Sequence, residues 1–196
     1  MRDPWYGGDR DVFKWSTLVH LARRESVPAI LHVAMYRPAA DPPPLLTAQG
    51  HVALPVEVRQ HFWNLDNIQY LSEVTGLAID VYKEPFVHRA PYFNEVCRRI
   101  QAMSTPVVVF LDPDIGVESD AVGLAFVVSA EVALVFDALR AGDVLVCYQR
   151  ARRQKDWRGR ARRAFANAPG LPSFDVEILR SELARDVLLL AAKKAP

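Results

Sequence analysis

The 196-residue sequence has few cysteines and no long apolar run, and each shortage excludes a class of protein. Cys97 and Cys147 lie in segments with helix and strand patterns, so we expect free buried thiols rather than a disulfide or a zinc site. No stretch approaches the ~18 consecutive apolar residues of a membrane span, and the first residues lack the apolar core of a signal peptide. We therefore expect a cytoplasmic protein.

The composition fits one globular domain. Hydrophobic residues make up 51% of the chain and charged residues 24%, which is ordinary for a folded protein. The length falls within the range of about 100 to 200 residues typical of one domain with a full core. We predict a single domain over residues 1–196.

The net charge of +1 conceals an uneven distribution. Residues 150–163 hold eight arginines and lysines against one aspartate, which gives +7 locally and leaves −6 for the rest (1 − 7). Such a basic segment favours a nucleic-acid partner, with Trp157 stacking on an unpaired base. Phosphate contacts would suit four of its arginines: Arg153, Arg158, Arg160 and Arg162. The alternative is a solvated helix face that pairs with the acidic remainder of the chain.

Hydrophobic periodicity alternates between strand and helix along the chain. The pattern predicts strands over 28–35, 77–85, 106–111, 143–149, 173–180 and 184–194. It predicts helices over 9–24, 55–75, 91–103, 129–141 and 156–167, with a proline-rich loop at 37–50. In the first helix, the spacing of Val12, Trp15, Val19 and Ala22 predicts a buried face.

This alternation predicts a Rossmann-like α/β fold, doubly wound, with a mostly parallel sheet and helices on both faces. The last two strands are joined by too few residues for a crossover helix. They must therefore pair antiparallel, which adds a C-terminal hairpin to the sheet.

Polar side chains lie at the carboxyl ends of four predicted strands, which is the edge where ligands bind in open parallel sheets. They are Tyr36 and Arg37, Lys83 and Glu84, Asp112 and Asp114, and Tyr148, Gln149 and Arg150. Their convergence would make a site. The alternative is that strand ends are polar because the chain leaves the core there.

The segment "LDPDIG" presents two carboxylates, Asp112 and Asp114, on a turn stiffened by Pro113. Together with Glu84 they resemble the toprim arrangement of nucleases and topoisomerases, which implies Mg²⁺ or Mn²⁺ as cofactor and phosphodiester cleavage as the reaction; Glu118 is a further candidate ligand. Alternatively, Asp112 caps the turn by accepting bonds from backbone N–H groups, and Asp114 is solvated.

A Rossmann-like core with a terminal hairpin, and "LDPDIG" after a central strand, resemble the class I S-adenosylmethionine-dependent methyltransferases over about residues 9–194. The resemblance implies methyl transfer to an amino group, here on nucleic acid, with Asp112 and Asp114 as catalytic residues and Asp112 orienting the acceptor. It also implies that Tyr36, Arg37 and Glu84 lie near the cofactor. Two features depart from the pattern: "HVAMYRPAA" has no glycine, and Asp114 and Ile115 replace a proline and an aromatic residue.

Two further expectations concern the start of the chain and the family. The motif "RDVFKW" places Asp11 and Lys14 three residues apart on one helix, which favours a surface ion pair. Together with "FLDPDIG" and "GDVLVCYQ", the same motif resembles a group of bacterial proteins to which no chemistry is assigned. A glycine-free turn after the first strand would also suit a non-catalytic relative that keeps the fold as a binding module.

Overall fold

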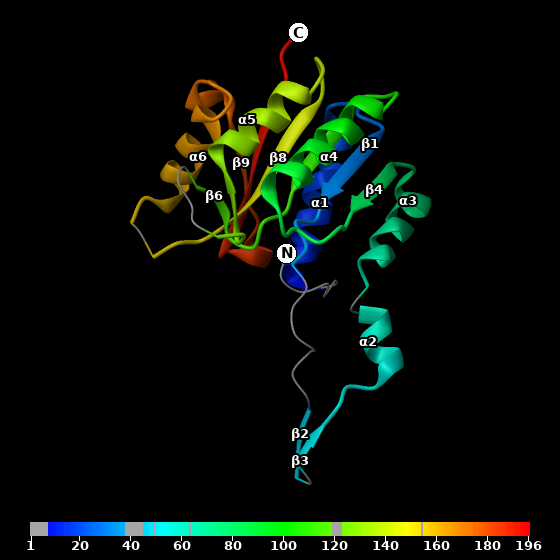
Figure 1. Cartoon of the computed structure of the whole chain (residues 1–196). Helices are drawn as coiled ribbons and strands as arrows, with labels where there is room; N and C mark the ends of the chain where they lie inside the picture. Colours follow the sequence, from blue (N-terminus) through cyan, green and yellow to red (C-terminus); the bar gives the residue numbers. More distant parts are fainter. Residues whose placement is uncertain (1–7, 38–44, 49, 63, 119–122, 154) are drawn as a thin grey trace.

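The computed structural model describes residues 8–37, 45–48, 50–62, 64–118, 123–153 and 155–196, with a six-stranded sheet at its centre (Figure 1). The strand order is β4 (Ala78–Tyr82), β1 (Ala29–Val33), β5 (Val107–Leu111), β8 (Val144–Arg150), β10 (Val187–Lys193) and β9 (Glu177–Leu179). Strands β4, β1, β5 and β8 run parallel, whereas β10 is antiparallel to both β8 and β9. The predicted Rossmann-like sheet with a C-terminal antiparallel hairpin is confirmed.

Helices cover both faces of this sheet, as the doubly wound prediction requires. One hydrophobic cluster joins α1 (Asp9–Arg24) and η1 (Leu65–Gln69) to the sheet. The opposite cluster joins α4 (Arg89–Ala102), α5 (Ser129–Ala138) and α6 (Trp157–Asn167). Shorter helices are α2 (Val56–Phe62), α3 (Tyr70–Thr75), η2 (Ser173–Asp175) and η3 (Glu182–Ala184).

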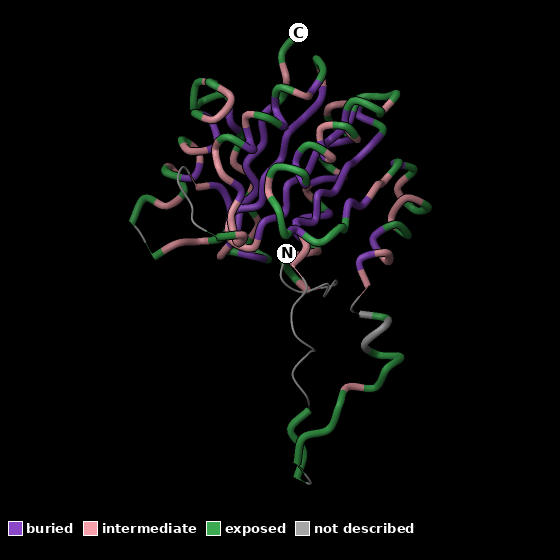
Figure 2. Tube along the Cα trace, in the orientation of Figure 1, coloured by how far each residue is buried: buried purple, intermediate pink, exposed green. Residues whose placement is uncertain are grey.

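The central strands are buried from end to end (Figure 2). In β5, Val107 and Val109 face one cluster while Val108 and Phe110 face the other, because successive strand side chains point to opposite sides. The run "VVVFL" therefore has no polar position, as expected of a parallel strand covered on both faces.

The prediction of which α1 residues are buried was correct for Trp15 and Ala22 but wrong for Val12. Val12 is 49% exposed, whereas Lys14, Leu18 and Leu21 are buried. The helix contacts β1, β5 and η3, so the stripe it buries passes through these positions rather than through Val12. A hydropathy pattern does not place a lysine in such a stripe, and Lys14 was accordingly missed.

Two pairs of short strands were also missed. Part of the segment predicted as a proline-rich loop forms an antiparallel pair of β2 (Leu45–Thr47) and β3 (Gly50–Val52), while residues 38–44 and 49 lie outside the described residues. Strands β6 (Gly116–Glu118) and β7 (Phe126–Val128) form a parallel pair. Three-residue strands are too short to show a period of two.

The structure also bears on the two cysteines and on the expected lack of a membrane span. Cys97 and Cys147 are both free, and Cys147 is buried as predicted, but Cys97 is only half-buried, so the prediction of burial was wrong for Cys97. Within the described ranges, no helix is both long enough and apolar enough to cross a bilayer.

Candidate functional site at the carboxyl edge of the sheet

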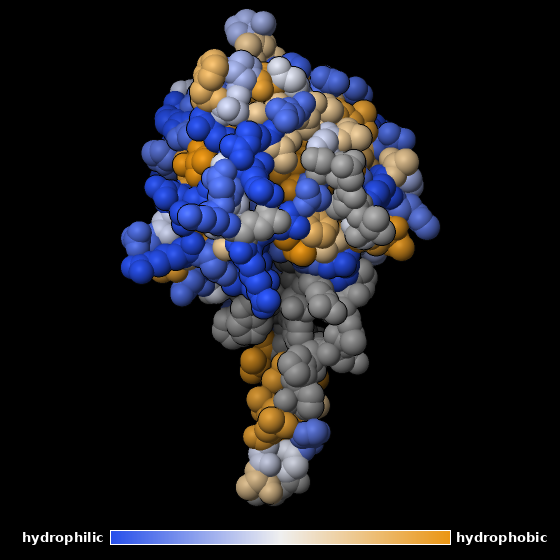
Figure 3. Space-filling model, turned by 90° about the vertical axis from the view of Figure 1, so that its left-hand side faces the viewer, coloured by the Kyte–Doolittle hydropathy of each residue, from blue (hydrophilic) through white to orange (hydrophobic). Residues whose placement is uncertain are grey.

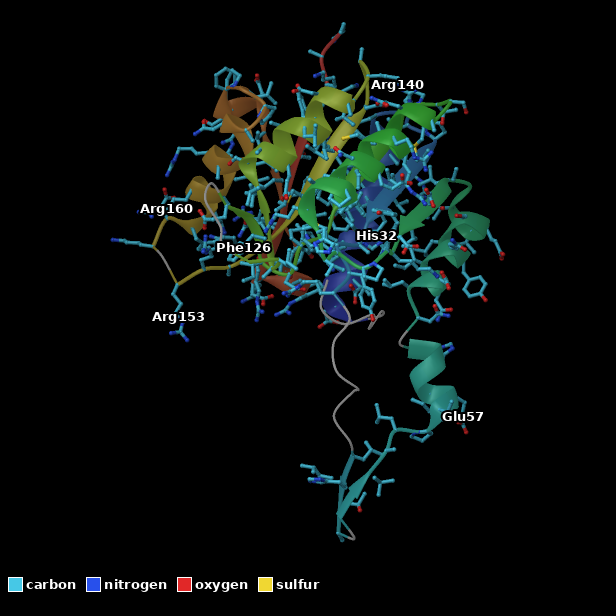
Figure 4. The ribbon with its side chains drawn as sticks, viewed as in Figure 1. His32, Glu57, Phe126, Arg140, Arg153 and Arg160 are labelled. Atoms are coloured by element: carbon cyan, nitrogen blue, oxygen red, sulfur yellow. The ribbon has the colours of Figure 1, made fainter. Side chains whose placement is uncertain are left out.

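The strand order reverses direction beside β1, and ligands of open α/β sheets bind at such a switch point. The chain passes from β1 to β4 on one side, then to β5 on the other side of β1. His32 lies near the end of β1, as Figure 4 shows, and Asp112 directly follows β5. Helix α1 contacts both strands, which brings Lys14 to the same point.

Lys14, Asp112 and His32 form one buried set of contacts, which we call the Lys14–Asp112–His32 network. The Lys14 Nζ atom lies 3.0 Å from Asp112 Oδ2, and His32 Nε2 lies 3.2 Å from the same oxygen. The Asp112 side chain is only 2% exposed. Lys14 also lies 3.4 Å from Asp11 Oδ1, so the predicted Asp11–Lys14 pair is confirmed, although it is not a surface pair.

Lys14 and Asp112 are both ionised at neutral pH. Burial would raise the pKa of Asp112, but the Lys14 charge and the His32 hydrogen bond outweigh it and hold that pKa well below its ordinary value. Burial would likewise lower the pKa of Lys14, but the Asp112 and Asp11 charges raise it on balance. Asp112 is therefore a carboxylate held against a fixed ammonium group.

His32 serves the network as a neutral ring. It is 1% exposed and packs between Phe110, stacked with ring centroids 5.2 Å apart, and Trp15, edge-on at 5.5 Å. Burial lowers the pKa of His32, so the ring is uncharged. A neutral imidazole next to a carboxylate carries its hydrogen on the facing nitrogen, so Nε2 donates to Asp112.

An open cleft of about 710 Å³ lies over the network. It is lined by the start of α1, by residues 112–115, and by Tyr148 and Arg150 from β8, with Arg37 at the end of β1. Asp114 forms an ion pair with Arg37 across this lining, and burial raises the pKa of Tyr148 to about 12. The predicted convergence holds in part. The polar strand-end residues that line the cleft are Arg37, Asp112, Asp114, Tyr148 and Arg150, whereas Tyr36, Lys83, Glu84 and Gln149 do not line it.

Gly116 and Gln149 fix the turn that carries the two aspartates. The Gln149 side chain is 1% exposed, accepts a 3.1 Å hydrogen bond from Val117 N–H and donates one of 3.2 Å to the Ile115 carbonyl. A Cβ atom at Gly116 would lie 2.1 Å from Gln149 Oε1, and the φ angle there is +139°. Only glycine allows this approach, so it is the docking of the turn onto β8 that requires Gly116.

Of the three predicted cofactor residues, only Arg37 lines the cleft. Tyr36 is half-buried, and its carbonyl accepts a 2.6 Å hydrogen bond from Phe86 N–H. Glu84 is exposed after β4, and neither Tyr36 nor Glu84 lines the cleft. In the glycine-free turn, Met35 adopts a left-handed conformation with φ of 45°, and its buried side chain packs in the same cluster as Phe86 and Tyr92.

The toprim-like set is not assembled. Within the described residues, no three His, Cys, Asp or Glu side chains come together as a possible metal site, so Glu84, Asp112 and Asp114 do not form one. Cations of the chain compensate the carboxylates instead: Lys14 for Asp112 and Arg37 for Asp114. The Arg37 pair also contradicts the alternative of a solvated Asp114, and Glu118 pairs with Arg152.

The basic segment begins at Arg150, the last residue of β8, and its residues 157–163 lie in α6. Arg153, Arg158 and Arg160 are exposed, and Arg162 is half-buried. Figure 3 shows hydrophilic residues gathered over this side of the molecule, and Figure 4 shows Arg153 pointing away from it. Trp157 packs against the core, with the Arg158 guanidinium 5.1 Å above its ring, so its neighbour already covers one ring face.

Comparisons with known proteins add only distant likenesses. No protein-family model and no curated protein matches the chain. A DUF574 family protein from Streptomyces avermitilis MA-4680 aligns over 95% of this chain and 82% of its own, at 13% identity and a TM-score of 0.41. A suspected methyltransferase from Thermobifida fusca YX aligns over the same shares, at 14% identity and a TM-score of 0.38. The fold assignment rests on the strand order described above.

Proposed function

We propose that the protein is a methyltransferase that uses S-adenosylmethionine to methylate an amino group on nucleic acid. The observation that carries the proposal is the ionised Asp112, which lines an open cleft at the switch point of the sheet. A carboxylate accepts a hydrogen bond from an amino N–H, and one that is fixed in place orients the nitrogen lone pair.

Lys14 and His32 prepare Asp112 for this role. The ammonium group keeps the carboxylate charged, and the His32 N–H holds its Oδ2 atom from the β1 side. Because Phe110 and Trp15 fix the imidazole, the carboxylate is oriented before the acceptor arrives. We assign Lys14 and His32 as positioning residues for Asp112.

The residues present are compatible with the cofactor. Glycine-rich turns supply left-handed backbone, and Met35 supplies it here while its side chain packs inward. We propose that S-adenosylmethionine is held by Tyr36 and Arg37, which follow β1, and by Glu84, which follows β4. When bound, this cofactor would supply an electrophilic methyl group, and the chain's part is to position the acceptor nitrogen in line with it.

Arg150 connects the cleft with the basic segment. It lines the cleft beside Tyr148, and it is also the first of the eight cations in residues 150–163. Arg150 forms no ion pair with any residue in the described part of the chain. A phosphate backbone lying along α6 would therefore meet a cation at the rim of the cleft, which supports a polynucleotide as the substrate.

Calorimetric titration with S-adenosylmethionine, followed by transfer of labelled methyl groups to single-stranded DNA and RNA, tests the proposal. We expect Asp112→Asn to bind the cofactor but to lose most methyl transfer, and Glu84→Gln to bind the cofactor more weakly. Oligonucleotide binding without cofactor binding would support a non-catalytic module instead. Cleavage of the oligonucleotide that requires Mg²⁺ would refute the proposal outright.

A double variant on α6 and a control variant on α4 test the proposed nucleic-acid surface. Replacing Arg158 and Arg160 by glutamine should weaken oligonucleotide binding at every sequence and lower the salt dependence of log K by about 1 to 2, because each phosphate contact contributes about 0.7 to 0.9. Arg98→Gln is the control, since Arg98 is exposed on α4 and pairs with Glu95. Equal effects of the two changes would contradict the assigned surface.

A further inference from the structure

A short apolar segment extends from the body of the protein, and we call residues 45–48 and 50–58 the arm. Figure 1 shows β2, β3 and α2 below the sheet, and Figure 3 shows hydrophobic residues along this extension. The side chains of Leu45, Leu46, Val52 and Val56 are 45%, 80%, 47% and 61% exposed. Contiguous exposed apolar residues of this kind mark an interaction surface rather than a random surface position.

The arm is poorly supported by the rest of the chain. Strands β2 and β3 pair only with each other among the described strands, over three residue pairs. A lone two-stranded hairpin is at best marginally stable in water. Leu45 and Val52 are cross-strand partners on one face of the hairpin, and Leu46 projects from the opposite face. Both faces therefore have apolar area to bury.

The charge of the arm restricts what can cover it. No Asp, Glu, Lys or Arg occurs from Leu45 to Val56, and Glu57 is the one such residue of the arm, whereas the rest of the chain is rich in charges. A nucleic acid needs cations to contact, so the arm is unsuited to the partner proposed for α6. A highly charged protein surface would lose its hydration there without gaining an ion pair.

We propose that the arm is a dimerisation element that binds the arm of a second copy of this chain. In a two-fold contact, the same patch meets itself, so like charges in it would repel and an uncharged apolar patch is self-complementary. Each hairpin also offers an open strand edge that an identical hairpin can extend. Because the arm projects from the body, two arms can meet at a distance from the sheets of both copies (Figure 1).

Sedimentation equilibrium of the full chain over a range of concentrations tests the proposal. We expect a monomer–dimer equilibrium, and Leu46→Glu should raise the dimer dissociation constant by about tenfold or more, because an apolar contact is replaced by two facing carboxylates. Phe174→Glu is the matched control, since Phe174 is 77% exposed on η2 in the body of the protein. It should leave the dimer unchanged.

A mixing experiment tests whether the arm meets the arm. Leu46→Glu and Leu46→Lys should each be monomeric alone, and a mixture of the two should regain the dimer through opposite charges. A wild-type protein that is monomeric at all concentrations overturns the proposal. So does a dimer unaffected by Leu46→Glu, or a mixture that stays monomeric, because the arm would then contact a different surface.

Discussion

Replacing Lys14 by methionine removes the ammonium group of the network but keeps an unbranched side chain of similar length. Asp112 would then remain 2% exposed, next to the neutral His32 and without the ammonium group that balances its charge. Removing one partner of a buried ion pair costs about 3 to 5 kcal/mol, because the remaining charge is left uncompensated. At about 2 to 4 °C for each kcal/mol in a domain of this size, the midpoint of thermal unfolding should fall by about 6 to 20 °C.

The change can be measured as the free energy of unfolding in urea, followed by tryptophan fluorescence. The double variant Lys14→Met/Asp112→Asn lacks both charges, so it should be more stable than Lys14→Met alone by about 2 kcal/mol. Lys193→Met is the control: Lys193 Nζ lies 2.9 Å from Glu25 Oε2 in an exposed ion pair, and its loss should cost about 1 kcal/mol or less. A Lys14→Met protein as stable as that control, or a double variant less stable than Lys14→Met, would refute the reasoning.

Three other predictions concern the same edge of the sheet. The pKa of Asp112 lies below its ordinary value of 3.8 in the folded state, so its contribution to stability is present above pH 3.8 and lost as the pH falls below it; Asp112→Asn should flatten this acid limb in urea titrations. The pKa of His32 is also lowered, so its contribution is present above its ordinary pKa of 6.5 and lost below it, and His32→Phe should remove that slope when stability is measured from pH 7 to 5. Gly116→Ala should cost about 1 to 3 kcal/mol more than Gly142→Ala in chemical denaturation, since both have positive φ angles but only at Gly116 would the new Cβ atom strike Gln149.

The sheet could be predicted because its central strands are buried on both faces, and such strands are uninterrupted apolar runs in the sequence. The run of residues 107–111 has no polar position, and the brevity of the link between the last two strands leaves only antiparallel pairing. The carboxyl edge followed from the same reading, since the residue after a buried parallel strand must lie there. This is why Asp112 could be placed beside Arg37 and Tyr148 without coordinates.

The partners of Asp112 could not be predicted in the same way. Lys14 was interpreted as a surface residue because hydropathy assigns a lysine to solvent. His32 lies in an apolar segment, where no neighbouring residue marks it as a partner of a carboxylate. Their contacts with Asp112 span 98 and 80 residues along the chain, and no local pattern encodes such a distance. Only Lys14 offered a signal: it stands between Phe13 and Trp15, both buried.

Lys14 lies on α1, whereas Asp112 follows β5, so their ion pair forms only when α1 docks onto the sheet. Before α1 docks, the Asp112 carboxylate can stay hydrated at the end of β5; afterwards it is enclosed together with its counter-ion. The sheet and the helix should therefore exchange amide hydrogens as one cooperative unit around this point, and any event that loosens α1 would separate the carboxylate from its counter-ion. The reactive edge of the sheet thus exists only as long as the first helix stays in place.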